Sequence, residues 1–119
     1  MVGKEPKGYP CEVCEVFSGD DLIVFMDLGV EGLHKKQRVR LHGVDTPNAI
    51  KAAPDTKAGE CRRYVRQLTL RRKGYFEIVS KNASSWVGVL TVETVHGAVN
   101  VNQDLIDQGF QYVAARERT

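Results

Sequence analysis

The sequence predicts one domain of a mainly β fold with helices (α+β), in which five strands form a barrel. Three observations predict it. Apolar and polar residues alternate over several short runs, as they do in strands that bury one face. A segment near the middle repeats its apolar residues at the 3.6-residue period of a helix. A length of 119 residues suits a single domain with one core.

Three strands are expected first. Residues 11–19 are rich in β-forming residues and lead into the turn formed by residues 18–21. Residues 22–28 form a near-continuous apolar run of strand length. Residues 29–37 are polar and contain two glycines, which predicts a loop that includes His34. Residues 37–44 then alternate apolar and charged side chains, so the three runs predict an antiparallel meander.

A helix is expected after a loop over residues 48–58. Asp55 or Thr56 is a suitable N-cap for this helix, and Gly74 is expected to end it. The apolar stripe of this helix consists of Ala58, Cys61, Val65 and Leu68. The stripe predicts that Cys61 is a core residue.

Two further strands, residues 75–80 and 86–94, are joined by a polar turn over residues 81–85. A short extended piece precedes a last short helix, for which Asn102 is the expected cap and Gly109 the expected end. The order β-β-β-α-β-β-α is that of the OB-fold, a five-stranded Greek-key barrel, and the alternative is an open α+β sheet. Residues 1–10 are expected to be a flexible lead-in, 11–115 the single domain and 116–119 a tail.

Charge is unevenly distributed along the chain. Residues 35–81 hold 13 of the 17 lysines and arginines and four acids, so this segment carries a net charge of +9 in a chain of net charge +2. Such a distribution is typical either of a local anionic partner or of a solvated helix face. No apolar run approaches the roughly 20 residues of a membrane span. Three cysteines, an odd number, favour a reducing, cytoplasmic setting.

Two aspartates are the candidate ligands of a cation. Asp20 lies in the turn between the first two strands, and Asp45 and Thr46 follow the third. These places converge at one rim of a barrel, where two carboxylates and a backbone carbonyl suit Ca²⁺. Arg40 lies where it can bind a phosphate beside that cation. The ordinary interpretation is that both aspartates stabilise turns and that Arg40 pairs with an acid.

These segments resemble the staphylococcal nuclease family. The resemblance rests on "EVFSGDDLIV", "VRLHGVDTPN", "VGVLTVET" and "VNQDLIDQG", in the family's order and over about residues 12–113. It implies an OB barrel and a Ca²⁺-dependent phosphodiesterase. It also implies that Asp20, Asp45 and Thr46 hold calcium and that Arg40 binds the substrate phosphate.

Two departures from the family pattern affect catalysis. The glutamate that acts on the attacking water is replaced by Asn48, which cannot accept a proton. The family's second catalytic arginine falls near Gly88, within Trp86-Val87-Gly88. Lys81 is the nearest cation, and a lysine cannot reproduce a bidentate guanidinium. The catalytic set is therefore incomplete.

The sequence thus predicts a module that binds single-stranded DNA or RNA, with weak or no phosphodiesterase activity. The residues expected to contact nucleic acid are Arg62, Arg63, Arg66 and Lys81. One alternative is an active Ca²⁺-dependent nuclease, and another is a protein-interaction module that uses its basic face. Cys11 and Cys14 have metal-ligand spacing, but residues three apart in a strand face opposite sides, which disfavours a shared metal.

Overall fold

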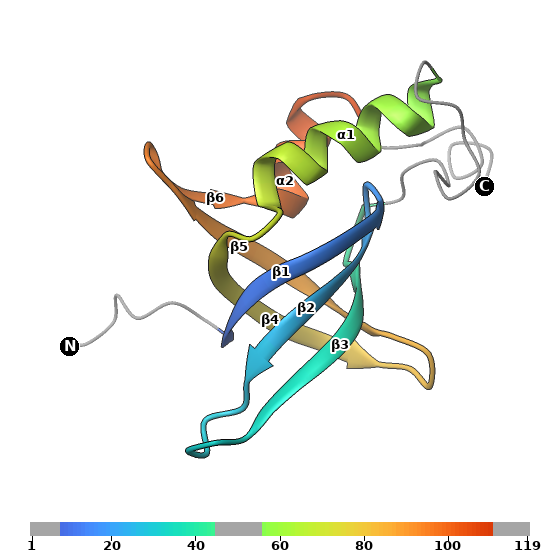
Figure 1. Ribbon diagram of the computed structural model, residues 1–119. Coiled ribbons are helices and arrows are strands. Elements are labelled where there is room, and N and C mark those ends of the chain that lie inside the picture. The colour runs from blue at the N-terminus through green and yellow to red at the C-terminus, as the bar shows by residue number, and fades with distance from the viewer. Residues whose placement is uncertain (1–7, 45–55, 111–119) are drawn as a thin grey trace.

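The computed structural model describes residues 8–44 and 56–110 (Figure 1). The predicted order of elements is confirmed, with one strand added. The described elements are β1 (Tyr9–Ser18), β2 (Asp21–Asp27), β3 (His34–Leu41), α1 (Lys57–Thr69), β4 (Lys73–Lys81), β5 (Trp86–Thr94), β6 (Gly97–Asn100) and α2 (Val101–Asp107). Within the described residues, neither helix is long and apolar enough to cross a membrane.

The first five strands close into a barrel. The hydrogen-bonded order is β3-β2-β1-β4-β5-β6, and a parallel pairing of β3 with β5 joins the two sides. In that pairing Val39, Arg40 and Leu41 lie beside Trp86, Val87 and Gly88. The closed five-stranded barrel is the OB-type architecture predicted from the element order. β6 pairs antiparallel with β5 as a sixth strand outside the closed barrel.

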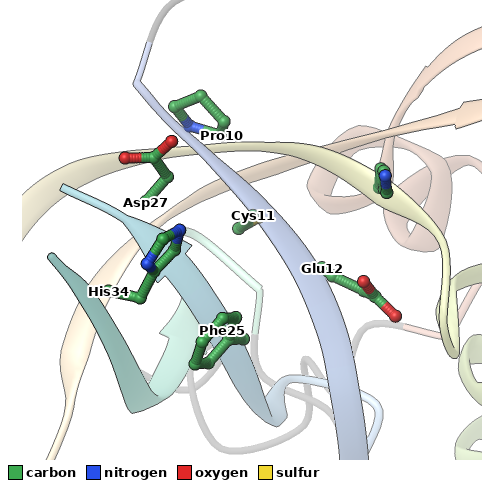
Figure 2. Close-up of a pocket in the computed structure, with 7 residues that line it drawn as sticks. Pro10, Cys11, Glu12, Phe25, Asp27 and His34 are labelled. Atoms are coloured by element: carbon green, nitrogen blue, oxygen red, sulfur yellow. The ribbon is translucent and has the colours of Figure 1, made fainter. Parts of the chain in front are cut away.

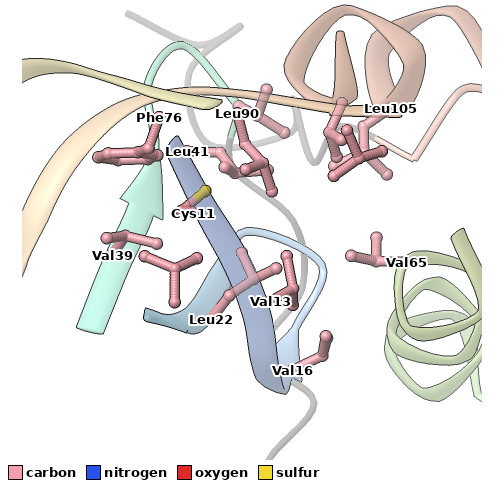
Figure 3. Packing of buried hydrophobic residues seen from close by; sticks show 14 of the residues in the cluster. Cys11, Val13, Val16, Leu22, Val39, Leu41, Val65, Phe76, Leu90 and Leu105 are labelled. Atoms are coloured by element: carbon pink, nitrogen blue, oxygen red, sulfur yellow. The ribbon is translucent and has the colours of Figure 1, made fainter. Parts of the chain in front are cut away.

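Inward side chains of the strands fill the barrel, and the helices cover one end of it. Figure 3 shows Val13, Leu22, Val39, Phe76 and Leu90 of the strands pointing into a common core. Val65 of α1 and Leu105 of α2 are fully buried and belong to the same core, and Cys61 is buried as predicted. The hydroxyl of Tyr64 donates a hydrogen bond of 2.5 Å to Asp104 Oδ2, which ties α1 to α2.

Two boundaries differ from the sequence prediction. β3 begins at His34, so His34 to Gln37 form strand rather than loop, because they pair with Val24 to Asp27 of β2. α1 ends at Thr69, and Arg71 supplies the left-handed backbone (φ 64°) of the reversal that follows. Gly74 instead lies inside β4, where a Cβ would come within 1.9 Å of the Thr91 carbonyl oxygen. Gly74 therefore permits a close approach of two strands and does not end the helix.

The cap of the second helix was also predicted wrongly. Asn100 is the N-cap of α2, and Asn102 is buried. Asn102 Oδ1 accepts from the Leu90 N–H (3.0 Å), and its Nδ2 donates to the His42 (2.8 Å) and Gly88 (3.1 Å) carbonyls. On β5, the pairing with β3 ends at Gly88 and the pairing with β6 begins at Thr91. The Asn102 side chain therefore satisfies backbone groups at the position on β5 where one neighbouring strand leaves and the next arrives.

Candidate functional site

The turn between β1 and β2 holds the first candidate aspartate inside the protein. Ser18 and Asp21 are paired across the turn, so Gly19 and Asp20 form its tip. The Asp20 side chain is 3% exposed, and its Oδ1 accepts a hydrogen bond from the Ser18 hydroxyl (3.2 Å). The backbone carbonyl of Asp20 accepts from the Leu41 N–H (3.0 Å), which fixes the turn against the end of β3. Strand pairing and turn length therefore bring Asp20 to Arg40.

Both aspartates of this turn form ion pairs with arginines of β3. Arg40 Nη2 donates to Asp20 Oδ2 at 3.0 Å. Arg38 Nε donates to Asp21 Oδ1 at 2.9 Å, and Arg38 Nη2 donates to Asp21 Oδ2 at 2.6 Å. This is the strong bidentate form of the arginine–carboxylate pair. This hydrogen bond to Asp21 raises the pKa of Arg38. The Arg38 guanidinium also lies over the ring of Phe17, 4.7 Å from its centroid.

Asp20 is the described member of the predicted calcium ligand set. Asp45, Thr46 and Asn48 lie outside the described residues. Both carboxylate oxygens of Asp20 already accept a hydrogen bond, Oδ1 from Ser18 and Oδ2 from Arg40. Residues 8–44 and 56–110 contain no group of three or more His, Cys, Asp or Glu side chains placed to hold a metal. Among the described residues, Asp20 is therefore seen as a partner of Arg40, and calcium binding stays a prediction.

The position of the second family arginine lies next to Arg40. The β3–β5 pairing places Val87 directly beside Arg40, with Gly88 one residue further. A Cβ at Gly88 would meet the Glu77 carbonyl oxygen at 2.1 Å and the ring of Phe76 at 2.8 Å. An arginine at Gly88 would therefore displace the backbone of β4, and the apolar Val87 occupies the place beside Arg40.

The four cations predicted to bind nucleic acid lie in two separate parts of the structure. Arg62 Nε donates to the Val16 carbonyl (3.0 Å) and so anchors α1 on β1, whereas Arg63 and Arg66 are exposed on α1. Lys81 lies at the end of β4, with its Nζ 4.5 Å from the ring centroid of Trp86. Figure 1 places α1 at one end of the barrel and the β4–β5 turn away from it.

A pocket that the sequence analysis did not predict lies at the other end of the β1–β2–β3 meander. Its volume is about 230 Å³, and it is lined by residues of four strands: Pro10, Cys11, Glu12, Phe25, Asp27, His34 and Lys73 (Figure 2). Asp27 and Asp21 are the two end residues of β2, so the pocket is about 20 Å from the ion pairs. The outward aromatic Phe25 within an otherwise buried strand is the sequence signal for this site.

Two aromatic rings and two carboxylates give the pocket its chemistry. The rings of Phe25 and His34 are parallel, with centroids 5.1 Å apart, and Phe25 is 44% exposed. Asp27 lies beside His34 in Figure 2 and accepts a hydrogen bond from the Gly29 N–H through Oδ1 (2.9 Å). Among the described residues, neither Asp27 nor Glu12 forms an ion pair with a cationic side chain.

The cysteines form no disulfide in the structure. Cys11, Cys14 and Cys61 are free thiols, and burial, with a smaller contribution from Cys14, raises the pKa of Cys11 to about 12. A thiol with such a pKa stays protonated at neutral pH and is a poor nucleophile and a poor metal ligand. Cys11 therefore contributes an apolar wall to the pocket.

The fold and the site together define an OB-type barrel with paired charges at its β1–β2 turn and an aromatic, acid-lined pocket at the opposite end. No family model matches the sequence, and no curated protein matches it. Among solved structures, the fold is similar to that of an extended Tudor domain, TD3 of mouse TDRD1, in complex with a MILI peptide containing dimethylarginine 45. The TM-score is 0.50 and the identity 16%, and the match covers 90% of this chain and 70% of that one. At this identity the likeness concerns the fold.

Proposed function

We propose that this protein is a protein-interaction module built on an OB-type barrel. The observation that carries the proposal is the pairing of Asp20 with Arg40 and of Asp21 with Arg38. In the nuclease family that the sequence resembles, the residues corresponding to Asp20 and Arg40 bind calcium and phosphate. Here the same groups neutralise each other and hold β2 to β3, so they stabilise the barrel in place of catalysing hydrolysis.

The likeness to the Tudor domain supports a protein as the partner. That domain shares the fold of this chain and was solved with a peptide bound to it. The pocket between β1, β2, β3 and β4 gives this chain a place where a side chain of a partner would fit.

Binding of single-stranded nucleic acid is the second candidate function. The observation that favours it is the outward row of Lys36, Arg38 and Arg40, all of them exposed on β3. Alternate residues of a strand are about 6.7 Å apart, so the row presents regularly spaced charges to a phosphate backbone. The pairing of Arg38 and Arg40 with aspartates leaves Lys36 as the cation of this row that no aspartate of the turn neutralises. The calcium site remains a prediction that the nuclease assay below tests.

The test compares ligand classes on one preparation of the full chain. A peptide array of varied sequence is screened, and the best peptides are remade and titrated by fluorescence polarisation at 150 mM salt. Labelled 12-nucleotide DNA and RNA are titrated in parallel and incubated with Ca²⁺ or EDTA. We expect array peptides to bind with micromolar Kd, nucleic acid to bind more weakly and lose affinity with salt, and no cleavage. Calcium-dependent cleavage, or nucleic acid bound more tightly than every peptide, would overturn the proposal.

A further inference from the structure

The pocket on the β1–β2–β3 meander presents unpaired carboxylates beside exposed aromatic rings. Aromatic faces attract cations, and a guanidinium group both stacks on such faces and donates bidentate hydrogen bonds to carboxylates. The parallel rings of Phe25 and His34 supply the stacking surface, and Asp27 lies beside them. Glu12 lies along β1 on the other side of the same pocket.

The size of the pocket limits what it can hold. Sites for cofactors and drug-sized ligands are typically about 300–1,000 Å³. A volume of about 230 Å³ is below that range and suits one long side chain rather than a whole small molecule. From the charge, the stacking surface and the volume, we infer that the pocket binds the guanidinium of one arginine side chain from a partner protein.

This inference rests on the proposed function and adds to it the chemistry of the partner. Lys73 lies on the pocket wall, opposite Glu12 in the β1–β4 register, and repels a bound guanidinium. Neutralising Lys73 is therefore expected to raise the affinity for an arginine side chain. Neutralising Asp27 or Glu12 is expected to lower that affinity. A pocket built for an acidic group would show the reverse order.

The probes are nine-residue Gly/Ser peptides that carry one central arginine, citrulline, lysine or glutamate. Citrulline has the shape of arginine without its charge, so the pair isolates the ionic contribution. The ¹⁵N-labelled chain is titrated with each peptide by NMR. We expect the arginine peptide to shift amides at residues 9–12, 25–27, 34 and 73, and to bind at least five-fold more tightly than the citrulline peptide.

Three variants test the site without disturbing the fold. Asp27→Asn keeps the Oδ1 acceptor for the Gly29 N–H and removes the charge, and Phe25→Leu replaces an exposed ring. Each is expected to weaken the arginine peptide about five-fold, whereas Lys73→Gln strengthens it about two-fold. Glu93→Gln is the matched control, because Glu93 is an exposed acid on β5 outside the pocket, and it leaves the affinity unchanged.

Four outcomes overturn the inference. They are equal binding of arginine and citrulline, preference for the glutamate peptide, shifts confined to other parts of the chain, and loss of binding in the control variant. If array peptides bind but retain full affinity for Asp27→Asn and Phe25→Leu, the pocket assignment fails and the protein-interaction function stands. If no array peptide binds, the proposed function itself fails.

Discussion

Neutralising Asp20 distinguishes a role in an ion pair from a role as a metal ligand, because the two roles predict changes in protein stability of opposite sign. A carboxylate cluster that awaits a cation is strained by like-charge repulsion, so replacing one member with an amide relieves it. A carboxylate that accepts from an arginine in a buried position loses a charge-assisted hydrogen bond, worth about 1.5–3 kcal/mol. The Asp20 side chain is 3% exposed and lies 3.0 Å from Arg40 Nη2, which places it in the second class.

Asp20→Asn is therefore expected to destabilise the protein by about 2 kcal/mol. For a domain of this size that corresponds to a fall of roughly 8 °C in Tm. Arg40→Gln is expected to cost a similar amount, because it removes the guanidinium that donates to the buried Asp20 carboxylate, while water at the half-exposed Arg40 position limits the loss. The loss of stability in the double variant should be smaller than the sum of the two single losses by about 1 kcal/mol or more.

The assay is urea unfolding followed by far-UV circular dichroism, with and without 10 mM CaCl₂. Asp107→Asn, at an exposed acid of α2, is the control and should change the stability by less than about 0.5 kcal/mol. An Asp20→Asn variant that is more stable than the parent would refute the ion-pair reasoning. Calcium that stabilises the parent and not the variant would refute it as well, because binding to the native state alone raises stability.

Three further predictions follow from the packing of the barrel and its helices. Asn102→Ala should destabilise the protein by about 3 kcal/mol because it strips buried backbone groups of their partners, whereas Gln103→Ala should be near neutral; thermal unfolding distinguishes them. Burial and the hydrogen bond to Asp104 raise the pKa of Tyr64 to about 12, above the ordinary value of about 10, so Tyr64 stabilises the fold below pH 10 and this stability is lost as pH rises toward 12. In Tyr64→Phe, the free energy of unfolding should no longer show this fall as the pH rises from 10 toward 12. Gly74→Ala should prevent cooperative folding, as judged by NMR line widths, because its Cβ would meet a backbone oxygen at 1.9 Å.

Periodicity in the sequence predicted most of the fold. The alternation in residues 37–44 and the apolar stripe from Ala58 to Leu68 each report a buried face, and burial of that face is what organises a strand or a helix. The roles of individual residues were harder to predict from the sequence. Asn102 has the residue type of a helix cap, and its role at the junction of β3, β5 and β6 depends on contacts between segments distant in the sequence.

The sequence allowed Arg40 to pair with an acid but did not show which acid it would be. The sequence identifies Asp20 and Arg40, but their contact depends on the length of the β1–β2 turn and on the register of β2 with β3. The pocket has no local motif, because residues 10–12, 25, 27, 34 and 73 come together through strand pairing alone. Phe25 could have been noted as an outward aromatic residue in a buried strand.

We propose that this barrel binds protein and does not process nucleic acid. The most direct measurement is a competition at 150 mM salt between a labelled array-selected peptide and unlabelled 12-nucleotide RNA, with Ca²⁺ present and the RNA recovered afterwards on a gel. The account predicts that the peptide stays bound when the RNA concentration is ten times the Kd of the peptide. It also predicts that the RNA is recovered intact. Displacement of the peptide by RNA, or shortened RNA that depends on Ca²⁺, would contradict it.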